Sequence, residues 1–569
     1  MNKSLTQRYH HTLNNILAGD KLANLIVFVL FTAFYLLTMA GNLSETDDVY
    51  AFAYRTEQFS FSHVSDPRLM LFHMLSKVVY IAINALSGLL DMTVSALFSM
   101  RLFSACCAAI SLLLLLRILY RDFKLSPQAA VLGSLLLAFS YGFWRYAAEA
   151  EVYIAATALC LLIFHLMLTP RWQSLKYQLL VGVLAGLSIL FYQPDAIPLL
   201  FAFPLLTLGG GQIIAVGGYY CAAGCTLLAG YLWGFWLFWP EPLSLDSFIQ
   251  FLSQRSEEFM VPAMSFMTVI VSMLRALFAL SHDTVSTNWI FSFHAVQQFI
   301  HWLFPQNVIT EEIFLAKSIG PWRYLFAVSH ILLIGIILFL LASRLPKVRF
   351  SQISRQVWVV VIWVLINGAI IGRLNPAGTE AWIMLLAPLT ILVSLWIIQP
   401  LLDTHKKTLV LLVSLLFAHN LLAGMLLVHN PGEEYHRIKG KWVIEHATAD
   451  DLVIVSGDAG FAEALRYLSP AKILYIGKNE TGELLSALMD NQLNNLSLLS
   501  RGRDFNGQSI AANMQQHWQH NGRVMVFDEL FNSGDPMLNL KIQQFSQKIP
   551  AIYQPAQMSA TYLLQAPAK

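Results

Sequence analysis

Residues 22–40, LANLIVFVLFTAFYLLTMA, carry no charged side chain over 19 positions. A helix of this length can cross the hydrocarbon core of a bilayer, which is about 30 Å thick. Polar side chains follow directly in residues 41–68, namely Glu45, Asp47, Asp48, Arg55, Glu57, His63, Asp66 and Arg68. The sequence therefore predicts a membrane anchor followed by a polar site at the membrane face, where adjacent carboxylates would carry out proton chemistry.

The composition indicates a multispanning membrane protein. The chain is 56% hydrophobic and 12% charged, with a mean hydropathy of +0.57. Its net charge of +2 gives no argument for nucleic acid as a partner. The cysteines lie in apolar stretches without metal-ligand spacing, which predicts neither a disulfide framework nor a zinc site; they are Cys106, Cys107, Cys160, Cys221 and Cys225.

The topology follows from the basic residues, because Lys and Arg in short loops stay on the cytoplasmic side. Basic clusters follow apolar stretches at 117–124, 171–176, 344–355 and 406–407. The loops 41–94 and 239–321, and everything after about residue 429, are then periplasmic. This gives about eleven spans if residues 69–90 and 263–280 do not cross. His73 and Lys77, four apart, fit an interfacial or re-entrant helix. We expect a multi-pass protein of the cell inner (cytoplasmic) membrane.

The composition changes after residue 430. Strand-like runs at 452–460, 471–477 and 522–530 alternate with helical stretches. Residues 430–569 are therefore predicted to form a small soluble α/β domain with a partly parallel sheet. Ser456-Gly457-Asp458 at a strand end is either a binding turn or a turn in which Asp458 caps a helix, and the cap is preferred.

Several short motifs are spread over most of the chain: Thr46-Asp47-Asp48, Asp66-Pro67-Arg68-Leu69, Met100-Arg101-Leu102, Phe143-Trp144 with Ala150-Glu151-Val152-Tyr153, and Gly457-Asp458. Together they resemble the GT-C superfamily of polyprenyl-phosphate-sugar glycosyltransferases, especially bacterial relatives of protein O-mannosyltransferases. Those relatives often have His-Pro-Pro where this chain has Asp66-Pro67-Arg68. The resemblance implies a GT-C-like transmembrane catalytic domain over residues 1–429.

It also implies transfer of a sugar, with inversion, from a polyprenyl-phosphate donor to an acceptor on the outer face. The acceptor would be a protein hydroxyl, a lipid or a polysaccharide. Because phosphate is the leaving group, the protein must supply a base for the acceptor hydroxyl and cations for the departing charge. Asp47 or Asp48 would be the base, with Asp47 preferred, and the other would contact the acceptor or a divalent cation. A capped loop start is the alternative. No other cofactor is implied.

Arg101 would hold the donor phosphate, because an Arg within an apolar helix usually marks function; snorkelling to the headgroups is the alternative. Arg255 and Arg373 are further phosphate candidates, or ordinary interfacial charges. Arg145 can pair with Glu149 at i+4, which leaves Glu151 for the active cavity. The remaining candidates for contact with sugar or acceptor are Arg55, His63, Asp66, Arg68, His73, Tyr153, Gln193 and Asp195, the last two alternatively forming a turn.

Three other classes of protein compete with this prediction. A lipid-linked glycan ligase would share the topology and need an outer Arg. A transporter or flippase would also use intramembrane charge, but the repeated halves with broken helices typical of that class are not visible. A nonenzymatic scaffold would leave the polar loop at 41–68 without a purpose.

The topology predicts that loop 41–94 and the C-terminal domain lie on the same, non-cytoplasmic side. Single cysteines introduced at Ser60 and Ser509 should react with an impermeant thiol reagent in intact cells. Protection of both, together with labelling near Lys347, would contradict the predicted orientation.

Overall fold

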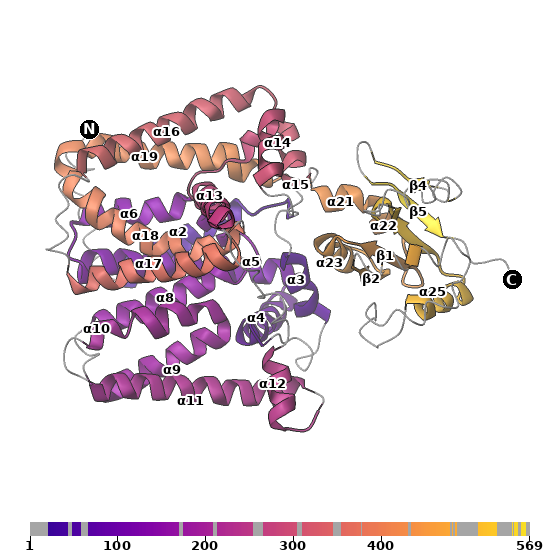
Figure 1. Ribbon diagram of the computed structural model, residues 1–569, viewed down its shortest axis with the longest axis horizontal. Helices are drawn as coiled ribbons and strands as arrows, with labels where there is room; N and C mark the ends of the chain where they lie inside the picture. Colours follow the sequence, from indigo (N-terminus) through magenta and orange to yellow (C-terminus); the bar gives the residue numbers. More distant parts are fainter. Residues whose placement is uncertain are drawn as a thin grey trace. The chain divides into compact units, whose positions relative to one another are not determined.

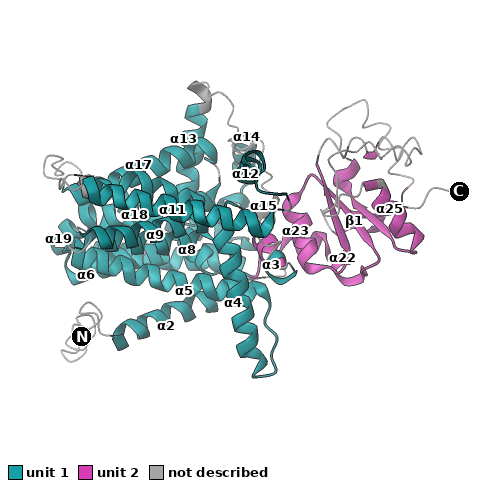
Figure 2. Ribbon diagram, turned by 90° about the horizontal axis from the view of Figure 1, so that it is seen from below, with its two compact units in different colours: residues 1–40, 55–429 teal, residues 41–54, 430–569 magenta. Residues whose placement is uncertain are grey.

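The computed structural model describes residues 21–43, 48–58, 67–169, 174–208, 213–239, 241–253, 266–303, 310–344, 354–376, 378–430, 434–477, 481, 484–485, 510–531, 549, 551–555 and 559–564. The chain forms two compact units. Unit 1 comprises Met1–Ala40 and Arg55–His429, and unit 2 comprises Gly41–Tyr54 and Asn430–Lys569 (Figure 2). The boundary between the units therefore falls inside one helix, α3 (Asp48–Gln58).

Helices make up the described part of unit 1 (Figure 1). The longer ones are α2 (Lys21–Leu37), α4 (Met70–Gly88), α5 (Ala96–Arg117), α6 (Pro127–Phe139), α8 (Tyr153–Leu168), α9 (Leu175–Phe191), α11 (Ile213–Phe238), α13 (Phe266–Thr284), α16 (Trp322–Arg344), α17 (Arg355–Leu374), α18 (Thr379–Val393) and α19 (Gln399–Asn420). Shorter pieces join them: η1 (Ile118–Asp122), α7 (Tyr141–Ala147), η3 (Gln193–Asp195), η4 (Pro198–Ala202), α10 (Leu205–Leu208), α12 (Leu245–Ser253), η6 (Asn288–Ser292), α14 (His294–Leu303), α15 (Thr310–Ala316), η7 (Lys317–Ile319), η10 (Ser394–Ile398), η11 (Leu421–Met425) and α20 (Leu426–Val428).

Many of these helices suit a membrane, where backbone polar groups must be satisfied within the helix itself. Among the described residues, six stretches are long and apolar enough to cross a bilayer, and four shorter apolar helices accompany them. One of the six, Thr379–Val428, has 50 residues and contains a kink at His405. The Met70–Gly88 helix also qualifies by length and hydropathy, so the count of eleven spans stays a prediction.

Helix α5 lies at the centre of unit 1 and packs against α2, α4, α6, α7 and α8. The pair α9 and α11 packs closely because glycines line the contact. A Cβ on Gly182 would overlap the Tyr219 carbonyl, and one on Gly186 would overlap the Thr226 side chain. Small residues four apart allow this approach between apolar helices.

Asn420 ties together three segments that are distant in sequence. Its Nδ2 donates to the carbonyl oxygens of Phe139 at 2.7 Å and Thr284 at 2.9 Å, and its Oδ1 accepts from the Ser286 amide at 2.8 Å. The buried amide thus joins the end of α6, the end of α13 and helix α19. This junction helps to define the end of unit 1 where the candidate site lies.

Unit 2 contains a five-stranded mixed sheet in the order β2-β1-β3-β5-β4. Strands β1 (Leu452–Ser456), β2 (Lys472–Ile476) and β3 (Val524–Phe527) are parallel, and β5 (Thr561–Leu564) and β4 (Ala551–Tyr553) add antiparallel pairs. The partly parallel sheet is confirmed. The antiparallel strands β4 and β5 were not anticipated from the sequence.

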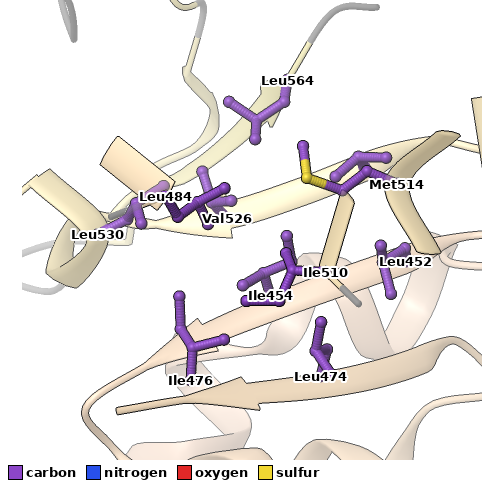
Figure 3. Close-up of a cluster of buried hydrophobic side chains, with 11 residues drawn as sticks. Leu452, Ile454, Leu474, Ile476, Leu484, Ile510, Met514, Val526, Leu530 and Leu564 are labelled. Carbon is purple, nitrogen blue, oxygen red and sulfur yellow. The ribbon is translucent and has the colours of Figure 1, made fainter. Parts of the chain in front are cut away.

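Alternate side chains of the strands cover the two faces of the sheet, as the two-residue period requires. Ile454 and Val526 face α25 (Ile510–Gln519) through Met514, as Figure 3 shows. On the other face, Val453 and Phe461 belong to a second core with α22 (Lys441–His446) and α23 (Ala459–Leu468).

The turn after β1 begins helix α23. Gly457 has a φ of +73°, which favours glycine, and the Asp458 side chain accepts from the Phe461 amide at 2.9 Å. The preference for a helix cap over a binding turn is confirmed. Asp458 also pairs with Lys439 at 3.0 Å, and the same ammonium contacts Glu529 at 2.7 Å. Burial alone would lower the pKa of Lys439, but the two carboxylates outweigh it and raise that pKa above its usual value.

Candidate functional site

The short helix α7 and the turn after it supply the first part of the site. Residues 141–158 are all buried, and Arg145 forms an ion pair with Glu149. The two side chains are 3% and 0% exposed. The predicted i+4 pair is confirmed, and because a buried charge needs a partner, its first role is structural.

Glu151 and Tyr153 follow that pair and connect α8 to two other helices. The Glu151 side chain is buried, and its backbone carbonyl accepts from the Ser104 hydroxyl of α5 at 3.3 Å. The Tyr153 hydroxyl donates to Glu380 Oε2 of α18 at 2.8 Å. The structure therefore brings a carboxylate of α18 to the predicted Glu-Val-Tyr segment.

A row of tyrosines extends from this segment. Tyr146 and Tyr192 each meet Tyr153 edge to face, with ring centroids 5.6 Å apart in both pairs. Glu151 and Glu380 lie within electrostatic range of both Tyr146 and Tyr192. The row thus passes through a group of buried and half-buried carboxylates.

Arg68 joins the same group, since it lies within electrostatic range of Tyr192. Its carbonyl accepts from the Gln193 amide at 3.3 Å. The Gln193 side chain donates to the Tyr231 hydroxyl at 2.9 Å. The hydrogen bond between Gln193 and Arg68 brings the start of α4 and the η3 turn together.

Asp195 forms a turn, which is one of its two predicted roles, and its contact with sugar or acceptor stays a prediction. It is part of the η3 turn, and its Oδ2 accepts from the Ser188 hydroxyl at 2.6 Å. Its buried Oδ1 has no hydrogen-bond partner within the described ranges. The turn is therefore formed, with one carboxyl oxygen left over.

Sequence reasoning missed two carboxylates of this group, Asp283 and Glu380. Asp283 ends an otherwise apolar stretch of α13 and is buried, and its Oδ2 has no hydrogen-bond partner in the described part of the chain. A Cβ on Gly142 of α7 would lie 2.7 Å from its Oδ1, so this glycine makes room for the carboxyl. A lone acid in an apolar helix was the signal that could have found both residues.

The cationic candidates occupy several helices. Arg101 Nη2 donates to the Ala40 carbonyl at 2.7 Å, which braces the chain just after α2. Arg373 lies in the last turn of α17, which packs against α18. Arg55 lies in the last turn of α3, and the buried His73 of α4 contacts the Phe72 ring at 5.5 Å. The structure therefore shows a bracing contact for Arg101, and its binding of the donor phosphate stays a prediction.

Asp48 is the first residue of α3 and is exposed. A carboxylate in the first turn is stabilised there by the helix dipole, which agrees with the alternative of a capped loop start. Some candidates lie outside the described residues, namely Asp47, His63, Asp66 and Arg255. Within the described ranges, no three His, Cys, Asp or Glu side chains are grouped to hold a metal ion.

The chain is similar to one protein family and to several solved structures. Residues 61–207 match the family model of the N-terminal domain of the protein O-mannosyltransferase TMEM260. The structure of ArnT from Cupriavidus metallidurans bound to undecaprenyl phosphate is similar, with a TM-score of 0.50 at 11% identity over 95% of this chain and 97% of that one. The apo oligosaccharyltransferase of Archaeoglobus fulgidus gives 0.44 at 11% identity, over 92% and 73%. No curated protein matched the sequence.

The chain therefore has the GT-C glycosyltransferase fold of a multi-pass membrane protein, and the resemblance of its motifs to the GT-C superfamily is confirmed. The family match includes Arg68, Arg101, Glu151 and Asp195, and it begins after Thr46-Asp47-Asp48.

The buried ion pair of α7 can be tested by its stability. Arg145→Met leaves the Glu149 carboxylate buried without its cation, so the free energy of unfolding should fall by about 3 kcal/mol or more. The double variant Arg145→Met/Glu149→Met should be less destabilised than Arg145→Met alone. Thermal unfolding of the purified protein in detergent measures both. The exposed Arg121→Met is the control, with a change within about 0.5 kcal/mol. Additive losses in the double variant would contradict the pairing.

Proposed function

We propose that the protein is an integral membrane glycosyltransferase that transfers a sugar from a polyprenyl-phosphate donor to a hydroxyl or glycan acceptor on the outer face, with inversion. Residues 1–429 would form the catalytic domain and 430–569 a periplasmic α/β domain, in the cell inner membrane. The GT-C fold supports this proposal, and so does the undecaprenyl phosphate bound by the similar ArnT structure.

The observation that carries the proposal is the group of carboxylates and tyrosines at one end of the unit 1 helices. Glu151 of the turn before α8, Glu380 of α18 and Asp283 of α13 lie around Tyr146, and Glu380 also accepts from the Tyr153 hydroxyl. Carboxyl oxygens accept hydrogen bonds, and the hydroxyls of a sugar are donors. Tyrosine rings add flat apolar faces with a polar end. This chemistry suits a sugar held at the boundary of the apolar helices.

The reaction needs a base and a cation, and the chain supplies both. The acceptor hydroxyl attacks the anomeric carbon from the side opposite the phosphate, the bond to the phosphate oxygen breaks, and the lipid phosphate leaves with the bonding electrons. Asp47 or Asp48 takes the hydroxyl proton. Arg101, Arg255 or Arg373 neutralises the charge that develops on the phosphate, alone or with a divalent cation.

Other candidates are assigned to the sugar and the acceptor. Glu151, Tyr153, Gln193 and Asp195 would contact the sugar, together with Glu380 and Asp283. Arg55, His63, Asp66, Arg68 and His73 would contact the sugar or the acceptor. A protein, a lipid or a polysaccharide could each present the required hydroxyl.

A lipid-linked glycan ligase is the second candidate, because an outer Arg and carboxylate would serve it too. Purified protein in nanodiscs, incubated with a synthetic polyprenyl-phosphate monosaccharide and a hydroxyl acceptor, separates the two. Mass spectrometry should detect loss of the single sugar from the lipid. Transfer only of a preassembled glycan would favour the ligase, and movement of intact lipid across the bilayer would favour a flippase.

The catalytic carboxylate is tested by Asp47→Asn and Asp48→Asn. The variant that lacks the base should lose turnover by about 10²-fold or more while still binding donor lipid, because an amide cannot accept the proton. Asp246→Asn in the exposed helix α12 is the matched control and should keep normal turnover. Near-normal transfer by both variants would place the base elsewhere, with Glu151 as the next candidate.

Arg101 is tested by Arg101→Lys, which keeps the charge but loses the planar fork that grips two phosphate oxygens. A phosphate role predicts weaker donor binding in this variant and still weaker binding in Arg101→Ala. Thermal unfolding of the same Arg101 variants shows how much stability is lost with the contact between Arg101 and the Ala40 carbonyl. Normal donor affinity and turnover in folded Arg101→Lys would refute the phosphate role and leave snorkelling or bracing.

A further inference from the structure

The segment that carries Asp48 packs with the C-terminal domain. Residues 41–54 belong to unit 2, although the chain on either side of them belongs to unit 1 (Figure 2). Within α3, Val49 and Ala53 are fully buried and Tyr50 is 1% exposed. The first turns of this helix are therefore buried and belong to unit 2.

Tyr50 makes the polar contact that holds this segment in unit 2. Its hydroxyl donates to Glu434 Oε1, and Arg437 Nε pairs with Glu434 Oε2 at 2.6 Å. Glu434 is fully buried; its Oε1 accepts from the Tyr50 hydroxyl and its Oε2 is ion-paired with Arg437. The Tyr50 ring also lies 5.8 Å from that of Tyr467. We call Tyr50, Glu434 and Arg437 the α3 junction.

Burial gives this junction its rigidity. Burial and the Glu434 carboxylate raise the pKa of Tyr50 well above its usual value, so the phenol remains a donor at any physiological pH. Removing either partner from the buried Glu434 carboxylate would cost free energy of folding, so Tyr50 and Arg437 are held in place.

The junction is also linked to the sheet. Arg437 lies in α21 (Tyr435–Lys439), and the last residue of this helix is the buried Lys439, which pairs with Asp458 after β1 and Glu529 after β3. The carboxyl ends of two adjacent parallel strands thus hold α21, and α21 holds Tyr50 through Glu434. Asp48 is two residues before Tyr50 in the same helix, so fixing Tyr50 fixes the rotation of the first turn.

We propose that the C-terminal domain positions Asp48 for catalysis through the α3 junction, with Tyr50 and Glu434 as positioning residues. This rests on the proposed function. It gives the domain a specific role in turnover, because the α3 junction fixes the helix that carries Asp48.

Full-length protein in nanodiscs, assayed with the synthetic monosaccharide donor, tests the proposal through Tyr50→Phe, Glu434→Gln and the double variant. A displaced carboxylate should lower turnover by about 10-fold or more while donor affinity stays normal. Because both changes act on one contact, the double variant should be no slower than the slower single variant. Tyr553→Phe in β4 removes a hydroxyl elsewhere in the domain and should keep normal turnover.

Amide hydrogen exchange provides a readout that does not depend on activity. Residues 48–54 should exchange faster in Tyr50→Phe and Glu434→Gln than in the wild type, while the strands β1 and β3 keep their protection. Normal turnover in folded Tyr50→Phe, or fully additive losses in the double variant, would overturn the proposal. A parallel loss of donor affinity would overturn it too. A wild-type protein without transfer activity would instead refute the proposed function, and the catalytic role of the junction with it.

Discussion

The constraint on which this structure depends is that a charge buried among apolar side chains must be paired. In unit 1, Arg145 and Glu149 meet this constraint within one turn of chain, which allows a charged helix to stand inside the core. In unit 2, the buried Lys439 meets it by contacting carboxylates that follow two different strands. Each pairing fixes a backbone segment next to residues proposed to act on substrate.

The pairing with Arg145 also distinguishes the structural carboxylate Glu149 from the carboxylates of the candidate site. Once Arg145 occupies Glu149, the neighbouring Glu151 and the more distant Glu380 lie beside the tyrosine row without being needed to neutralise that cation. Asp283 is held over Gly142, where only the absence of a side chain leaves room for it. The carboxylates of the candidate site are therefore distinct from the Arg145–Glu149 pair, and polar groups in an apolar setting usually serve a purpose.

The C-terminal domain takes on a second role in this arrangement. The sheet has a hydrophobic core on each of its two faces, and residues 41–54 belong to the same unit as the sheet. Chain connectivity then requires α3 to continue from unit 2 into unit 1. Through the α3 junction, the C-terminal domain contacts the helix that carries Asp48.

Local patterns in the sequence were enough for the helices, the partly parallel sheet and the cap at Asp458, because these depend on hydropathy, periodicity and neighbours a few residues apart. The Arg145 and Glu149 pair was predictable for the same reason. The contact between Tyr153 and Glu380 joins residues 227 positions apart, and the one between Tyr50 and Glu434 joins residues 384 apart. Only tertiary packing decides which such side chains meet, because no local period relates them. The sequence by itself thus determined a membrane-embedded helical protein with a C-terminal α/β domain, and the tertiary structure decided which carboxylates share a site and which domain holds Asp48.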